Sequence, residues 1–115
     1  MAIQIWHNPR CSKSRETLAL LEENGVSPEV YLYLTEAPNA TEIKSILSKL
    51  DISARELLRS SEDAYKSQNL KDATLTESAL ISAMAAEPKL IQRPIVVNGE
   101  KAKIGRPPEQ VLDII

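Results

Sequence analysis

The single cysteine, Cys11, is the residue best suited to chemistry in this sequence of 115 residues. It follows the turn-forming segment His7-Asn8-Pro9 and stands where a helix is predicted to begin. Unpaired backbone N–H groups and the positive end of the helix dipole meet at such a position and favour a thiolate. Arg10, Lys13 and Arg15 add positive charge nearby. We therefore expect a nucleophilic thiol at Cys11 rather than an inert core cysteine.

The residues that follow Cys11 exclude two common kinds of cysteine site. A dithiol redox motif of the Cys-x-x-Cys type would need a second cysteine where Ser14 stands. A phosphatase-type phosphate loop would need an arginine where Thr17 stands. Because Ser14 cannot resolve a mixed disulfide at Cys11, any redox cycle must borrow a thiol from another molecule. The pattern predicts a nucleophile with one thiol and an anion site.

Composition narrows the class of protein further. Hydrophobic residues make up 43% and aromatic residues 3%, without Phe, so the core is expected to be aliphatic. The net charge of −2 and pI near 5.5 give no overall basicity for binding nucleic acid. One Cys and one His exclude an internal disulfide and a multi-thiolate zinc centre, and no metal site is predicted. Without an apolar run of about 18 residues or a secretory signal, we expect no membrane association and a reducing cytoplasmic location.

The first third of the chain predicts a strand, a helix and a second strand. Apolar residues at 3–6 form the first strand, and a helix from Cys11 or Ser12 to Asn24 follows, with Gly25 as its left-handed cap. Residues 29–34 are the second strand candidate. This order is typical of a right-handed, parallel βαβ unit.

The middle of the chain, from about 40 to 87, is predicted to be a helical insert within a single domain covering residues 1–115. A helix over 41–50 shows apolar residues at helical spacing, and a short helix follows over 55–59. A capping box of Thr74 and Glu77 is expected to open a third helix that stops before Pro88.

The last third returns to strands and closes with a helix. Residues 94–97 form a β-branched run, Asn98-Gly99 is a hairpin signal, and 101–104 is the antiparallel partner. Gly105 to Pro108 breaks the sheet, and Pro107 is expected in the first turn of a closing helix. Periodicity alone therefore predicts an α/β protein of order β-α-β, helical insert, β-β-α.

Four ordered motifs resemble the glutaredoxin-dependent arsenate reductases of the ArsC family, most closely the chromosomal YfgD-like branch. They are HNPRCSKSR at 7–15, LLR at 57–59, RPIV at 93–96 and IGRPPE at 104–109. The resemblance runs from residue 3 to the C-terminus in the right order and spacing. It implies a thioredoxin-like fold, with a mixed four-stranded sheet and an inserted helical subdomain.

Carried over residue by residue, the resemblance makes Cys11 the nucleophile toward arsenate. Arg59, Arg93 and Arg106 resemble the arginines that hold the oxyanion and its covalent adduct. Planar guanidinium groups match the paired oxygens of a tetrahedral anion, which agrees with this role. Each of the three stands at a predicted structural break that faces a loop. Arg15 and Arg55 are weaker candidates.

Several residues are expected to support the site. Pro94 resembles the thioredoxin-fold proline whose preceding peptide bond is cis and packs beside the active cysteine. His7 is expected either to hydrogen-bond near the thiolate or to end a strand, and Asn8 to shape the turn. Ser14 occupies the position of a resolving cysteine.

The implied function is reduction of arsenate to arsenite through an arsenic–sulfur adduct on Cys11, a reaction of arsenical resistance. No bound cofactor is expected; glutathione is the implied thiol co-substrate and glutaredoxin the implied partner. Arg10, Ser12 and Lys13 depart from the plasmid-type reductases, so another oxyanion stays open as the substrate. The alternative is a regulator similar to Spx, which binds RNA polymerase without turnover; Ser14 in place of a second cysteine disfavours it.

Overall fold

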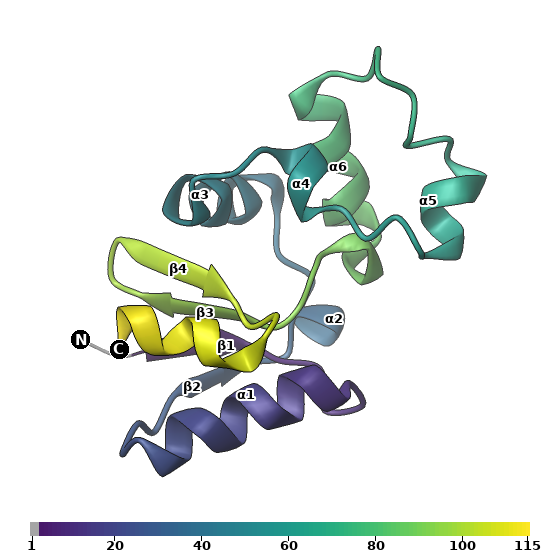
Figure 1. Cartoon of the computed structure of the whole chain (residues 1–115). Coiled ribbons are helices and arrows are strands. Elements are labelled where there is room, and N and C mark those ends of the chain that lie inside the picture. Colours follow the sequence, from purple (N-terminus) through teal and green to yellow (C-terminus); the bar gives the residue numbers. More distant parts are fainter. Residues whose placement is uncertain (1–2) are drawn as a thin grey trace. The chain divides into compact units, whose positions relative to one another are not determined.

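The computed structural model describes residues 3–115, which form two compact units (Figure 1). The first unit contains the chain up to Glu36 together with Arg93–Ile115, and the second is Ala37–Gln92. The second unit contains the stretch 40–87 that was expected to be a helical insert. The assignment of 1–115 to a single domain stays a prediction, and its first two residues lie outside the described chain.

A mixed four-stranded sheet forms the centre of the first unit. Its order is β2-β1-β3-β4, with β1 parallel to β2 and antiparallel to β3, and β3 antiparallel to β4. The strands are β1 (Ile3–Trp6), β2 (Glu29–Tyr31), β3 (Ile95–Asn98) and β4 (Lys101–Ile104). The predicted fold class, a mixed four-stranded α/β sheet with inserted helices, is confirmed.

The register of this sheet brings three distant segments to one edge. Trp6, at the end of β1, pairs with Ile95 at the start of β3, and Ile95 pairs in turn with Ile104 at the end of β4. The chain leaving β1, the chain entering β3 and the chain leaving β4 therefore meet at the same edge.

Two helices cover one face of the sheet and close an aliphatic core. They are α1 (Ser12–Glu23) and the 3-10 helix η2 (Pro108–Ile114). The core joins residues of β1, β3 and both helices: Ile5, Leu21, Val96, Val111 and Ile114. α1 begins and ends as predicted, with Gly25 in the left-handed conformation after it.

The closing helix differs from the prediction in type and start. It is a 3-10 helix beginning at Pro108, and Pro107 is its N-cap in extended conformation. Its buried residues are Pro108, Val111 and Ile114, a spacing of three. Because a 3-10 helix has three residues per turn, this spacing puts all three side chains on one face. Leu112 and Ile115 are exposed.

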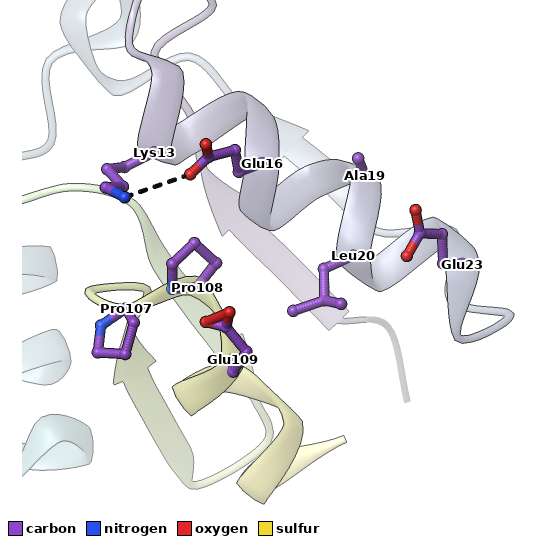
Figure 2. Close-up of a pocket in the computed structure, with 8 residues that line it drawn as sticks. All are labelled: Lys13, Glu16, Ala19, Leu20, Glu23, Pro107, Pro108 and Glu109. Carbon is purple, nitrogen blue, oxygen red and sulfur yellow. Dashed lines mark ion pairs between the residues drawn. The ribbon is translucent and has the colours of Figure 1, made fainter.

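A surface groove separates α1 from η2 (Figure 2). Glu16 and Glu23 of α1 and Glu109 of η2 line it, and Lys13 pairs with Glu16 at 3.5 Å. The groove is acidic overall, because its one cation is paired with one of its three carboxylates.

The second strand is shorter than the 29–34 predicted. Its last pair is Trp6 with Tyr31, and the His7 N–H donates to the Tyr31 carbonyl at 2.9 Å. β1 then turns away, so residue 32 has no strand to pair with. Instead the Leu32 carbonyl accepts the N–H groups of Thr35 and Glu36, and the chain turns into α2 (Tyr33–Glu36).

The hairpin between β3 and β4 turns one residue later than Asn98-Gly99. Asn98 remains in the ladder opposite Lys101, and its side-chain amide donates to the Ile114 carbonyl. The loop is therefore Gly99 and Glu100, and Gly99 takes the positive φ of 63° that tight hairpin turns require.

The second unit is built from short capped helices. They are α3 (Ala40–Leu50), α4 (Ala54–Leu57), α5 (Asp63–Ser67), α6 (Glu77–Ala86) and the 3-10 helix η1 (Pro88–Leu90). Asn39 with Glu42, and Ser53 with Glu56, form complete capping boxes at α3 and α4. No helix within residues 3–115 has the length and apolar character needed to cross a bilayer.

The predicted capping box at α6 is wrong. Thr76 is the N-cap and accepts from the Ala79 N–H at 3.1 Å, whereas Thr74 bonds to the Asp72 carboxylate. Glu77 is engaged elsewhere, because its carboxylate accepts the Ala54 N–H at 2.8 Å. A contact with residue 54 thus fixes the side chain that the local pattern assigned to the cap.

Gly105, directly after β4, packs closely against Thr17 of α1 and against Pro94, which precedes β3. A Cβ at this position would stand 2.5 Å from Thr17 Oγ1 and 2.9 Å from Pro94 Cγ. The Thr17 hydroxyl is held in place because it donates to the Lys13 carbonyl at 2.8 Å. The absence of a side chain at Gly105 therefore sets the spacing between α1 and the segment that follows β4.

We predict that Gly105→Ala lowers the free energy of unfolding by about 1–3 kcal/mol, because the added methyl overpacks this contact. Urea unfolding of the single and double variants with Thr17→Ala measures it. Since Thr17→Ala removes the closest atom, the two costs should be less than additive. Strictly additive costs, or a Gly105→Ala variant as stable as the wild type, would contradict the proposed spacing role.

Candidate functional site

Cys11 is the N-cap of α1, directly after the loop that leaves β1. Its backbone is extended, with φ −93° and ψ 124°, and its N–H donates to the Asn8 carbonyl at 3.0 Å. The residue is 8% exposed. The thiol therefore stands at the positive end of a twelve-residue helix, largely shielded from water.

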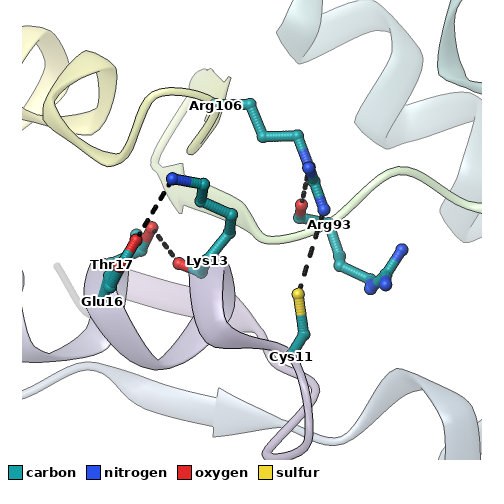
Figure 3. A network of polar contacts seen from close by, with 6 residues as sticks. All are labelled: Cys11, Lys13, Glu16, Thr17, Arg93 and Arg106. Carbon is teal, nitrogen blue, oxygen red and sulfur yellow. Dashed lines mark hydrogen bonds and ion pairs between the residues drawn. The ribbon is translucent and has the colours of Figure 1, made fainter.

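Arg106 reaches the Cys11 sulfur from the segment after β4 (Figure 3). Its Nη2 lies 3.9 Å from Cys11 Sγ, and its Nε donates to the Arg93 carbonyl at 2.7 Å. The guanidinium is thus held by the backbone of one predicted site residue while it faces the sulfur of another.

Arg93 enters the same corner from the segment before β3. Its Nε and Nη1 are buried and have no hydrogen-bond partner within the described residues. Buried donors of a charged group are costly when unpaired, so this guanidinium is suited to a ligand with acceptor oxygens. The peptide bonds Arg93–Pro94 and Arg106–Pro107 are both cis, as expected at Pro94 and not expected at Pro107.

Opposing effects set the pKa of Cys11. Burial raises the pKa of the thiol, because it disfavours the charged form. The backbone N–H groups of Ser14 and Lys13 and the positive charges of Arg93 and Arg106 lower it. The net result is a pKa below the ordinary value of a cysteine, which increases the thiolate fraction at neutral pH.

His7, Asn8 and Ser14 form a buried network behind the thiol. Ser14 Oγ lies 2.6 Å from His7 Nδ1 and accepts the Asn8 N–H at 3.0 Å. Burial lowers the pKa of His7, so the ring is neutral near pH 7. Asn8 Oδ1 in turn accepts the Arg10 N–H at 3.0 Å, which fixes the turn that leads into Cys11. In the sequence analysis Ser14 mattered only as the residue that replaces a second cysteine. The role of its hydroxyl as a bridge between His7 and Asn8 was not predicted.

The remaining predicted arginines have surroundings of their own. Arg15 is exposed on α1. Arg55 and Arg59 belong to the second unit, where Arg55 donates to the carbonyls of Leu70 and Asp72 at 2.8 and 2.9 Å. Arg59 pairs with Glu62 there. The structure thus brings Cys11, Arg93 and Arg106 together, and a role of Arg59 at this site stays a prediction.

Thr17 and Gly105 support the site, but the sequence analysis did not predict that they contact each other. Their tight packing holds the chain that carries Arg106 against α1, which carries Cys11. The only sequence signal was a glycine beside Arg106 at the end of a strand. Within residues 3–115, no three His, Cys, Asp or Glu side chains gather in a way that could hold a metal ion.

Comparison with known proteins places this geometry in a family. A model of the ArsC family matches residues 6–114. Over 114 residues the chain is 60% identical to the uncharacterized protein YfgD of Escherichia coli K12, covering 98% of this chain and 96% of that protein. It is 50% identical to an arsenate reductase of Haemophilus influenzae, with both chains fully covered.

Solved structures agree with these relatives. An arsenate reductase from Vibrio cholerae superposes with a TM-score of 0.98 at 51% identity, covering 100% of this chain and 98% of that one. The resemblance found in the four sequence motifs is confirmed, and the identity to YfgD is consistent with the chromosomal branch. The chain therefore belongs to the ArsC family.

Proposed function

We propose that this protein is an arsenate reductase in which Cys11 is the nucleophile and thiols from other molecules supply the electrons. One observation carries the proposal. A cysteine with a lowered pKa faces Arg106, beside Arg93, which holds two buried donors without a partner. The names of the relatives in Haemophilus influenzae and Vibrio cholerae support arsenate as the substrate.

Arsenate suits these groups because it is a tetrahedral anion with several acceptor oxygens. Arg93 offers Nε and Nη1 on one edge of its planar guanidinium, a pattern that can bind two oxygens of one anion. Arg106 brings a second positive charge beside the sulfur. The positive charges of Arg93 and Arg106 reduce the electrostatic repulsion between an anionic substrate and the Cys11 thiolate.

The first step of the proposed reaction is substitution at arsenic. The Cys11 thiolate attacks arsenic(V), a sulfur–arsenic bond forms, and one oxygen leaves with protons as water. Arsenic stays pentavalent in this step. Arg93 and Arg106 stabilise the charge that develops on the remaining oxygens, in a corner largely shielded from water.

Two external thiols complete the proposed cycle, since the chain has one cysteine. Glutathione replaces a second oxygen on arsenic as water, and a glutaredoxin thiolate then attacks the glutathione sulfur. The new disulfide leaves the electron pair of the broken arsenic–sulfur bond on arsenic, which becomes arsenic(III). Water releases arsenite and returns the Cys11 thiolate. No bound cofactor enters this scheme, and the reducing cytoplasm is its natural setting.

Arg59 is proposed as a third oxyanion ligand on the resemblance alone. Its side chain is 18% exposed, and its Nη1 pairs with Glu62. The Arg93 and Arg106 roles do not depend on it.

Cys11→Ser is expected to abolish reduction, because a serine hydroxyl is not ionised at neutral pH. The measurement is arsenate-dependent consumption of NADPH in the presence of glutathione, glutaredoxin and glutathione reductase. A wild-type rate equal to that of Cys11→Ser would contradict the proposal and favour the alternative, a regulator that binds RNA polymerase.

Arg106→Met is expected to lower kcat/KM for arsenate roughly 5- to 30-fold, corresponding to about 1–2 kcal/mol for a partly exposed charged hydrogen bond. Methionine keeps an unbranched flexible stem and removes the charge and the hydrogen-bond donors. Lys101→Met, on the exposed side of β4, is the matched control and should leave kcat/KM unchanged. Equal losses in the two variants would show a general effect of net charge.

The pH dependence of thiol alkylation should report a Cys11 pKa below that of a free cysteine, about 8.5. Because Arg106 lowers the pKa and burial raises it, Arg106→Met should move the midpoint to higher pH. Iodoacetamide modification followed by mass spectrometry measures both midpoints without arsenate. A midpoint at or above that of free cysteine in the wild type would show that the thiol is not activated.

A further inference from the structure

A second hollow lies beside the loop that leads into Cys11. It measures about 300 Å³ and is lined by residues 7–10, together with Leu32, Leu34 and Thr35 from the segment that follows β2. All of these residues belong to the first unit. The lining ends at Arg10, the residue that precedes the nucleophile in the sequence, so the hollow and Cys11 share one loop.

The wall of this hollow is tied firmly to the nucleophile. The Asn8 carbonyl accepts the Cys11 N–H at 3.0 Å, and Asn8 Oδ1 accepts the Arg10 N–H at 3.0 Å. Ser14 Oγ, on the first turn of α1, joins His7 and Asn8. A ligand seated against this loop is therefore held at a fixed place relative to Cys11.

The chemistry of the hollow suits a small anion with apolar parts. Leu32 and Leu34 are 39% and 37% exposed, so both present apolar surface at this hollow. Arg10 is exposed, and its guanidinium has no ion pair or hydrogen bond within residues 3–115. The hollow thus offers aliphatic contact and one unpaired positive charge.

The groove between α1 and η2 is the competing place, and its charge is opposite. Glu16, Glu23 and Glu109 line it, and its cation, Lys13, is already paired with Glu16 (Figure 2). An anionic molecule is repelled there and attracted to Arg10. The two surface hollows therefore differ in charge: the one with Arg10 attracts anions, and the one between α1 and η2 repels them.

We propose that the hollow at residues 7–10, Leu32, Leu34 and Thr35 is the binding site of the thiol co-substrate, the anionic tripeptide glutathione. This inference rests on the proposed function, which requires a small external thiol. Arg10 binds a carboxylate of the tripeptide, and Leu32 and Leu34 contact its aliphatic groups. Arsenate and the thiol then reach Cys11 from separate sites, the first held by Arg93 and Arg106.

The direct test is titration of the ¹⁵N-labelled wild-type protein with S-methylglutathione, which cannot react with Cys11. Amide shifts at His7, Asn8 and Arg10 and at residues 32–35 should change and saturate, while those of Lys13, Glu16 and Glu23 in the acidic groove should not. Arg10→Glu should weaken the affinity at least 5-fold. The matched control Lys44→Glu, an equal charge reversal on the exposed face of α3, should leave it unchanged.

The kinetic test separates the two substrates. Arg10→Glu and Leu34→Asp should raise the KM for glutathione at least 5-fold and leave the KM for arsenate within 2-fold of the wild type. Equal increases in both constants would overturn the proposal, and so would saturation at the acidic groove. So would shifts in the hollow that appear with glutaredoxin but not with the tripeptide.

The two proposals fail in different ways. Binding of S-methylglutathione in the hollow by a protein without arsenate turnover overturns the reductase function and supports the thiol site. Turnover that depends on Cys11 but is unchanged in KM for glutathione by Arg10→Glu and Leu34→Asp overturns the thiol site and leaves the reductase function standing.

Discussion

The stability of a negative charge on the Cys11 sulfur is the constraint on which the rest of the site depends. A thiol that is 8% exposed loses most of its contact with water, and this alone would favour the neutral form. The fold offsets that cost with backbone N–H groups at the start of α1 and with the charges of Arg93 and Arg106. The first contribution is local, whereas the second must be delivered from residues more than eighty positions away. The sheet brings these two arginines close to Cys11.

The register of the sheet brings together segments that are far apart in the sequence. Since Trp6 pairs with Ile95 and Ile95 with Ile104, the loop bearing Cys11 and the segments bearing Arg93 and Arg106 share one edge. Closeness within that edge needs finer control. The Arg93 carbonyl positions the Arg106 guanidinium, and Gly105 allows the strand end to contact Thr17 of α1. Two arginines of like charge are held together here by a backbone hydrogen bond, which an anion bound between them would further stabilise.

Local features of the sequence predicted most elements, and the errors have a common physical cause. The apolar run at 3–6, the cap at Gly25 and the hairpin at Gly99 depend on neighbouring residues alone. Strand β2 ends early because β1, its partner, turns away at His7, and Glu77 leaves the predicted cap because the Ala54 N–H binds it. The activation of Cys11 could be expected from the helix start, but the charges that lower its pKa are those of Arg93 and Arg106 and not those of the neighbours Arg10, Lys13 and Arg15. The contact of Cys11 with Arg106 could not be expected from local patterns, because the two residues are 95 positions apart in the sequence. Only the resemblance of the motifs to a known family indicated it.

The replacement of a resolving cysteine by Ser14 has a consequence for the whole design. A site with two cysteines has to bind only the oxyanion, because its second thiol, the reductant, is part of the same chain. With one thiol, the proposed reductase must admit an oxyanion and a separate reductant, both negatively charged, to the same sulfur. Binding both in one pocket would set their charges against each other. In the proposed scheme separate cations avoid this conflict, since Arg93 and Arg106 bind the oxyanion and Arg10, which lines another hollow, binds the thiol. The Ser14 hydroxyl meanwhile joins His7 to Asn8, so the residue that removes the internal thiol also fixes the loop between these two sites.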